Sequence, residues 1–195
     1  MSRVPRTLVL AACGVAITVA LAPGAAAAAA PRGVRVGSPA LIPAVAQVLG
    51  LLSPATKLDV TVTLAPRDPA GLTAFANAVS TPGSPLYHQY ITPARFAERF
   101  GPTAAQIAAV RSSLSAHGLH PGAVTANGLA IPVSATAGSL SSAFSIAFSR
   151  VLAPSGRVAF ASTAAPLFDA SVAGLVQGVV GLDTLSIPQP QALHP

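Results

Sequence analysis

Apolar and polar positions alternate along residues 58–64, which is the pattern of a β-strand with one buried face. The apolar spacing becomes helical over residues 72–79, shortly after the pair Asp68-Pro69. This pair suits the start of a helix, because aspartate accepts the first free amide hydrogens and proline fits the first turn. Residues 81–83, Thr-Pro-Gly, are typical of a helix end. The sequence therefore predicts a strand followed by a helix.

Two more helices are predicted directly after this one. Thr92, followed by a proline, repeats the start signal, and Gly101 ends the helix. Thr103 and Gln106 have the spacing of a capping box, which starts the next helix. Gly118 is a natural left-handed end for that helix.

The second half of the chain has shorter elements. Asn127-Gly128 between apolar runs at residues 119–126 and 129–134 is the strongest short-range signal for a β-hairpin. The remaining predicted elements are, in chain order, a helix at 136–143, a strand at 144–151, its antiparallel partner at 157–160 and an apolar strand within 175–182.

The predicted order is strand, helices, strand, strand, helix, strand. This is the split βαββαβ order of a ferredoxin-like α+β fold, in which helices cover one face of an antiparallel sheet. Residues 58–182 are sufficient for one hydrophobic core. The other face of the sheet is expected to meet solvent or a partner.

The first 30 residues have the order of a secretory signal peptide. Two arginines precede an apolar stretch at residues 8–21, and a run of alanines with cleavage sites follows. The stretch is short for a membrane-spanning helix, which needs roughly 20 residues. We therefore expect residues 1–30 to be a signal peptide and the mature chain to be secreted. Cys13 ends a lipid-attachment box, but the apolar stretch continues beyond it, which favours ordinary cleavage.

Three segments follow the signal peptide. Residues 31–57 are rich in proline, glycine and alanine, and they are expected to form a flexible linker or arm with a short helix in the apolar patch at 45–52. Residues 58–184 form the predicted domain. Residues 185–195 are proline-rich and are expected to be an extended connector.

Composition excludes several classes of function. The formal net charge is +6, and without residues 1–30 it is +4, from 9 basic and 5 acidic residues. The basic residues are scattered singly, so nucleic-acid binding is not expected. The four histidines lack the spacing of a metal site, and no glycine-rich phosphate loop is present. No metal or cofactor is therefore expected.

The acidic side chains do not form a catalytic pair in the sequence. They are Asp59, Asp68, Glu98, Asp169 and Asp183. No two of them have the spacing of an acid–base pair on one helix. The sequence therefore predicts no catalytic residues.

The most distinctive segment is residues 84–96, SPLYHQYITPARF, which contains both tyrosines of the chain. It closely resembles the signature of the activation (pro-) domain of the sedolisin or kumamolisin family of serine-carboxyl peptidases. Further segments resemble the family and occur in the family's order along the chain: 62–68 (VTLAPRD), His117-Gly118-Leu119, Asn127-Gly128, Ala143-Phe144 and 176–183 (VQGVVGLD).

The resemblance covers residues 58–184 and implies a secreted, non-catalytic pro-domain. Such a domain assists the folding of a sedolisin-type catalytic domain, in cis or in trans, and inhibits it until acid triggers proteolysis. Residues 185–195 would begin the connector that runs through the catalytic cleft. The family's catalytic Glu and Asp four residues apart and its Gly-Thr-Ser motif do not occur in this sequence. The alternative is a stand-alone secreted or surface-tethered binding module that has this fold without a protease partner.

The resemblance also marks candidate motif or interface residues, which are Tyr87, His88, Tyr90, Thr92, Phe96, Phe100 and Gly118. Two interpretations are open for the tyrosines and His88. Their rings either pack against Phe96 and Phe100 and fix the entry to the helix, or they line the interface with the peptidase. Aromatic residues near a helix start favour the first interpretation. Acid release is expected if interface carboxylates or His88 change charge.

Overall fold

The computed structural model describes residues 33–186, which all belong to one compact unit. The expected signal peptide, Cys13 and most of the expected connector lie outside the described residues. Within residues 33–186, no helix has both the length and the apolar character needed to cross a membrane.

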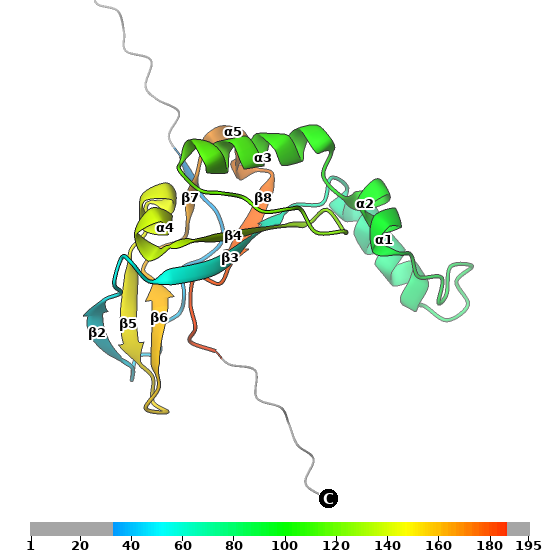
Figure 1. The fold of residues 1–195 in the computed structure, drawn as a ribbon. Helices are drawn as coiled ribbons and strands as arrows, with labels where there is room; N and C mark the ends of the chain where they lie inside the picture. The colour runs from blue at the N-terminus through cyan, green and yellow to red at the C-terminus, as the bar shows by residue number, and fades with distance from the viewer. Residues whose placement is uncertain (1–32, 187–195) are drawn as a thin grey trace, which may run out of the picture. The chain divides into compact units, whose positions relative to one another are not determined.

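The strand predicted at residues 58–64 is the central strand of the first sheet. It is β3 (Lys57–Leu64), and every second residue from Leu58 to Leu64 is buried. β3 pairs antiparallel with β4 (Ala130–Thr136) along one edge and with β8 (Val176–Val180) along the other. The strand order is therefore β4-β3-β8 (Figure 1).

A second antiparallel sheet has the order β2-β5-β6. It consists of β2 (Gln47–Leu51), β5 (Phe148–Leu152) and β6 (Val158–Ser162). β5 and β6 confirm the predicted antiparallel pair, which is joined by a turn at residues 153–156. A third, two-stranded pair joins β1 (Val34–Arg35) to β7 (Leu167–Phe168).

Five helices are present in the described residues. They are α1 (Pro69–Ser80), α2 (Pro93–Phe100), α3 (Ala104–Ala116), α4 (Ala137–Phe144) and α5 (Ala170–Ala173). The predicted helix starts are confirmed. Asp68 Oδ1 accepts a hydrogen bond from Gly71 N at 2.8 Å at the start of α1, and Thr92 caps α2 in the same way. Thr103 and Gln106 form the predicted capping box of α3.

The hydrophobic core lies between the buried face of β3 and the helices α3, α4 and α5. Its fully buried members include Val62 and Ile131 from the sheet, Val110 from α3, and Leu140 and Phe144 from α4. α1 and α2 lie side by side near one end of β3 (Figure 1) and are held by a separate cluster of phenylalanines. The molecule therefore has a main core and a smaller satellite cluster.

The α+β class with antiparallel strands is confirmed, but the ferredoxin-like arrangement is not. The strands form separate sheets in the described residues instead of one βαββαβ sheet. The first arm of the expected hairpin, residues 119–126, forms no regular strand: it makes an isolated bridge between Pro121 and Val133 and two further backbone hydrogen bonds, from Gly122 N to the Pro132 carbonyl oxygen and from Thr125 N to the Ala130 carbonyl oxygen. Pro121 and Pro132 have no amide hydrogen, so a regular ladder cannot continue between these two segments. β4 pairs with β3 instead, although the turn at Asn127-Gly128 is present.

The expected linker at residues 31–57 also differs from the structure. Its apolar patch forms the strand β2 and not the expected helix. β2 pairs antiparallel with β5, and the register shifts between Val48 and Gly50, where Gly50 has a φ of +110°. Pairing with a strand about 100 residues further along the chain decides this structure, and no local pattern contains that information.

Candidate functional site

One face of the β4-β3-β8 sheet points away from the core and remains accessible. The β3 residues on this face alternate with the buried ones and are exposed or half-buried. The register brings Pro132 and Ser134 of β4 and Val180 of β8 beside them. We call this surface the open face, defined by Lys57, Asp59, Thr61, Thr63, Pro132, Ser134 and Val180.

The open face is shallow, and the charges of its residues nearly cancel. Its charged residues are Lys57 and Asp59, and Asp59 accepts a hydrogen bond from Ser134 Oγ. Thr63 Oγ1 donates to the Gly178 carbonyl oxygen at 3.0 Å, while Val180 is 63% exposed. A shallow depression of about 380 Å³ lies over the Lys57 end and is open to solvent. Such a surface suits contact with another protein more than enclosure of a small molecule.

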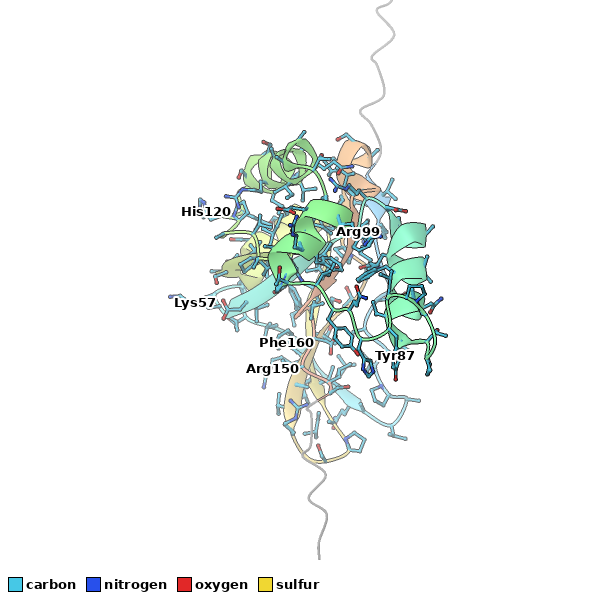
Figure 2. The ribbon with its side chains drawn as sticks, turned by 90° about the vertical axis from the view of Figure 1, so that its right-hand side faces the viewer. Lys57, Tyr87, Arg99, His120, Arg150 and Phe160 are labelled. Atoms are coloured by element: carbon cyan, nitrogen blue, oxygen red, sulfur yellow. The ribbon has the colours of Figure 1, made fainter. Side chains whose placement is uncertain are left out.

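The candidate tyrosines lie in the loop between α1 and α2, where Tyr87 is labelled in Figure 2. The ring of His88 stacks on Tyr87 with a centroid distance of 3.8 Å, and Tyr90 follows at 6.1 Å. His88 has a positive φ of 60°, and its amide donates to the Val79 carbonyl oxygen at 3.0 Å. Tyr90 is 73% exposed. We call these three residues the tyrosine stack; all three are exposed, although Tyr87 is only 39% exposed.

The candidate residues Phe96 and Phe100 form the satellite cluster together with Phe75 of α1, and we call it the phenylalanine cluster from here on. Phe100 is buried, and its ring centroid lies 5.6 Å from that of Phe75 and 5.5 Å from that of Phe96. The guanidinium of Arg99 covers this phenylalanine cluster, 4.8 Å from the Phe75 centroid and 4.9 Å from the Phe100 centroid. Among the ring pairs of residues 33–186, none joins the tyrosine stack to Phe96 or Phe100. This differs from the packing that the first interpretation expects.

Thr92 and Gly118 have local structural roles. Thr92 Oγ1 accepts the amide hydrogen of Arg95 at the start of α2. Gly118 follows α3 with a φ of +77°, and the next amide, that of Leu119, donates to the Leu114 carbonyl oxygen at 3.0 Å. This left-handed ending turns Leu119 into the core, so glycine is required by the backbone and not by a ligand.

A polar cluster that the sequence did not reveal joins α3 to the start of α5. Asp169 Oδ2 accepts a hydrogen bond from Ser113 Oγ at 2.6 Å, and Asp169 Oδ1 lies 3.0 Å from His117 Nε2. These residues are separated by 52 and 56 positions, so no motif spacing could identify them. The hydrogen bonds from Ser113 and then His117 lower the pKa of Asp169, while desolvation opposes them.

This cluster contains the three residue types of a serine-protease triad in a different arrangement. In a triad the histidine lies between the serine and the aspartate, so that it can remove the hydroxyl proton. Here Asp169 lies between the other two, and Ser113 Oγ donates to the carboxylate. The cluster therefore connects two helices and does not activate a nucleophile. Among residues 33–186, no three His, Cys, Asp or Glu side chains are placed to share a metal ion.

We expect Asp169→Asn to reduce stability in a pH-dependent way. The folded-state pKa of Asp169 is lowered, so its contribution is present above the ordinary aspartate pKa of about 3.9 and is lost as pH falls through the lower folded value. The side chain is 43% exposed, so we expect a loss of only about 0.5–1 kcal/mol at pH 7. Urea unfolding of both proteins between pH 7 and pH 2 measures it.

Asp68→Asn is the matched control for this prediction. Asparagine caps a helix as well as aspartate does, so this variant should change stability little. A difference between wild type and Asp169→Asn that is the same at pH 2 and pH 7 would contradict the assignment of the effect to the carboxylate charge.

Comparisons with known proteins agree with the resemblance seen in the sequence. A family model described as the pro-kumamolisin activation domain matches residues 45–185. Xanthomonalisin from Xanthomonas sp. (strain T-22) is 39% identical over 130 residues, which cover 67% of this chain and 16% of that protein. Sedolisin from Pseudomonas sp. (strain 101) is 30% identical over 131 residues, which cover 67% of this chain and 22% of that protein.

The matched range includes the β4-β3-β8 and β2-β5-β6 sheets, the five helices described above and the tyrosine stack, and it begins just before β2. The chain spans less than a quarter of the length of either relative. On the extent of the family match, this protein belongs to the pro-kumamolisin activation domain family.

Proposed function

We propose that this chain is a secreted pro-domain that acts as a folding assistant and inhibitor of a sedolisin-type serine-carboxyl endopeptidase and is released by acid-triggered proteolysis. The observation that carries the proposal is the family match over residues 45–185. This family is the non-catalytic pro-region of sedolisin-type peptidases, and a pro-region associates with its catalytic domain. The catalytic domain acts in cis or in trans.

The open face is the surface that we assign to the catalytic domain. An interface of standard size buries roughly 800 Å² on each partner and needs a surface without deep relief or dense charge. The open face meets the requirement for low charge density. It has one lysine and one aspartate, which already accepts a hydrogen bond from Ser134, and its other side chains are small or apolar. The tyrosine stack is a second candidate contact, because its rings are exposed and are not used in the phenylalanine cluster.

An inhibition assay tests the proposed function. The purified chain is added to the mature peptidase domain of a relative such as xanthomonalisin or sedolisin, and peptide hydrolysis is followed at mildly acidic pH. We expect slow- or tight-binding inhibition that weakens as the pH falls. Absence of inhibition of every family member tested would favour the alternative, a stand-alone binding module.

Val180→Arg tests the role of the open face in the same assay. Val180 is 63% exposed on β8, so arginine should not disturb folding, but it would bury an unpaired charge in the complex. We expect inhibition to weaken at least about tenfold, because an uncompensated buried charge costs several kcal/mol.

Val158→Arg is the matched control, because Val158 is 50% exposed on β6 in the other sheet. Equal inhibition by the two variants would contradict the assignment of the open face. Tyr90→Ala in the same series shows whether the tyrosine stack takes part; a loss of inhibition with unchanged thermal stability would identify it as a contact.

A further inference from the structure

After β8 the chain returns along the free edge of β6. Ser162 N donates to the Leu182 carbonyl oxygen at 2.9 Å, and Thr184 N donates to the Phe160 carbonyl oxygen at 2.9 Å. Between these bonds, Asp183 forms an antiparallel bridge with Ala161. Residues 182–185, here called the edge segment, therefore extend the β2-β5-β6 sheet beyond β6.

The side chain of Arg157 binds the last two residues of this edge segment. Its Nη2 donates to the carbonyl oxygens of Thr184 and Leu185, the latter at 3.1 Å. Arg157 lies directly before β6, where its own carbonyl oxygen accepts the Ala153 amide hydrogen at 2.9 Å across the β5–β6 turn. The guanidinium is thus positioned by a tight turn and reaches across to a segment 27 and 28 residues later.

Residues of the edge segment itself make further contacts that hold it in place. The side chain of Leu182 is 5% exposed and belongs to the main core. Thr184 Oγ1 accepts the Phe160 amide hydrogen at 3.1 Å, and Asp183 Oδ1 accepts the Leu185 amide hydrogen at 3.1 Å. Leu182 is held by burial, whereas the positions of Thr184 and Leu185 depend on polar contacts. Arg157 supplies the charged donor of this set.

We propose that Arg157 anchors the edge segment to β6 and thereby fixes the positions of Thr184 and Leu185 at the edge of the sheet. The significance of this anchor rests on the proposed function, in which the connector expected to begin at residue 185 leads toward the catalytic domain. Hydrogen bonds from a guanidinium to carbonyl oxygens are strong and directional, because the donor is charged and the geometry is fixed.

The anchor is also independent of acid. Arginine stays protonated at all relevant pH values, and carbonyl oxygens do not titrate. Asp183 is the titratable side chain within the edge segment, β6 carries no charged side chain, and Arg150 of the neighbouring β5 is always charged. Acid can therefore weaken carboxylate contacts, including the contact between Asp183 Oδ1 and the Leu185 amide, while Arg157 still binds the carbonyl oxygens of Thr184 and Leu185.

Hydrogen exchange of the full chain tests this proposal. We expect Arg157→Ala to raise the exchange of peptides that contain residues 182–186 about tenfold, since a hydrogen bond to a charged group contributes that much to a local opening equilibrium. Arg150→Ala is the matched control, because Arg150 is exposed on β5 opposite Phe160 (Figure 2) and should leave this exchange unchanged. In the wild type, the protection of the Thr184 amide, which donates to the Phe160 carbonyl oxygen, should be equal at pH 7 and pH 4 after correction for intrinsic rates.

Arg157→Lys keeps the charge but loses the planar fork, and it should give an intermediate exchange rate; it serves as the test variant if Arg157→Ala does not fold. Equal exchange in the Arg157 and Arg150 variants would overturn the anchor, as would loss of wild-type protection of the Thr184 amide at pH 4. Neither result depends on a peptidase, so failure of the anchor is distinguishable from failure of the inhibition assay.

Discussion

Replacement of Phe100 by alanine is expected to lower the free energy of unfolding by about 3–5 kcal/mol. Phe100 is 1% exposed, and its ring is the centre of the phenylalanine cluster, in contact with Phe75 and Phe96. Truncation leaves a cavity and also removes the ring over which the Arg99 guanidinium lies. Urea unfolding followed by circular dichroism measures the loss, and hydrogen exchange should show it first in α1 and α2.

Tyr90→Ala is the control for Phe100→Ala. Tyr90 lies ten residues earlier in the same motif but is 73% exposed, so its removal should change stability by no more than about 0.5 kcal/mol. If the two variants were equally stable, the phenylalanine cluster would not be what holds α1 and α2 together.

Replacement of Gly181 by alanine is expected to cost about 2–4 kcal/mol, from backbone strain and displacement together. Gly181 has a φ of +92°, which other residues rarely adopt. A Cβ at this position would lie 2.6 Å from the Asp59 carbonyl oxygen and 3.3 Å from Val60 Cα, both in β3. The backbone of β3 or of residue 181 must therefore move. Thermal and urea unfolding measure the cost.

Gly156→Ala separates the two contributions to this effect. Gly156 has a similar φ of +79°, but nothing lies within 4 Å of the position that a Cβ would take. Its replacement should therefore cost only the strain, about 1–2 kcal/mol. Equal losses in the two variants would mean that β3 adapts to the added methyl group without a penalty.

Phe100 and Gly181 belong to two different segments of the resemblance to the family, and each segment has its own structural role. Phe96 and Phe100 in the segment near residue 90 maintain the helix pair, while Gly181 lets the chain leave β8 close to β3. The tyrosine stack contributes to neither. Its exposed rings are the part of the motif that packing does not account for, which is why the inhibition series includes Tyr90→Ala.

Local patterns determined the elements whose signals lie within a few residues. The alternation at residues 58–64 gave β3, and the caps at Asp68, Thr92 and Thr103 gave the starts of three helices. These signals are reliable because the capping side chain and the amide that it binds lie three residues apart. The order of the motifs along the chain was also sufficient to indicate the family, because this order can be compared without knowledge of the three-dimensional structure.

Only the tertiary structure decided how the strands assemble and which side chains meet. An apolar run such as residues 45–52 pairs according to the partner that the fold brings beside it, so it became β2 beside β5. Ser113, His117 and Asp169, like Arg157 and Leu185, meet across 28 to 56 residues. Strand pairing and polar contacts of this kind depend on three-dimensional proximity, whereas periodicity and caps act within one or two turns of the chain.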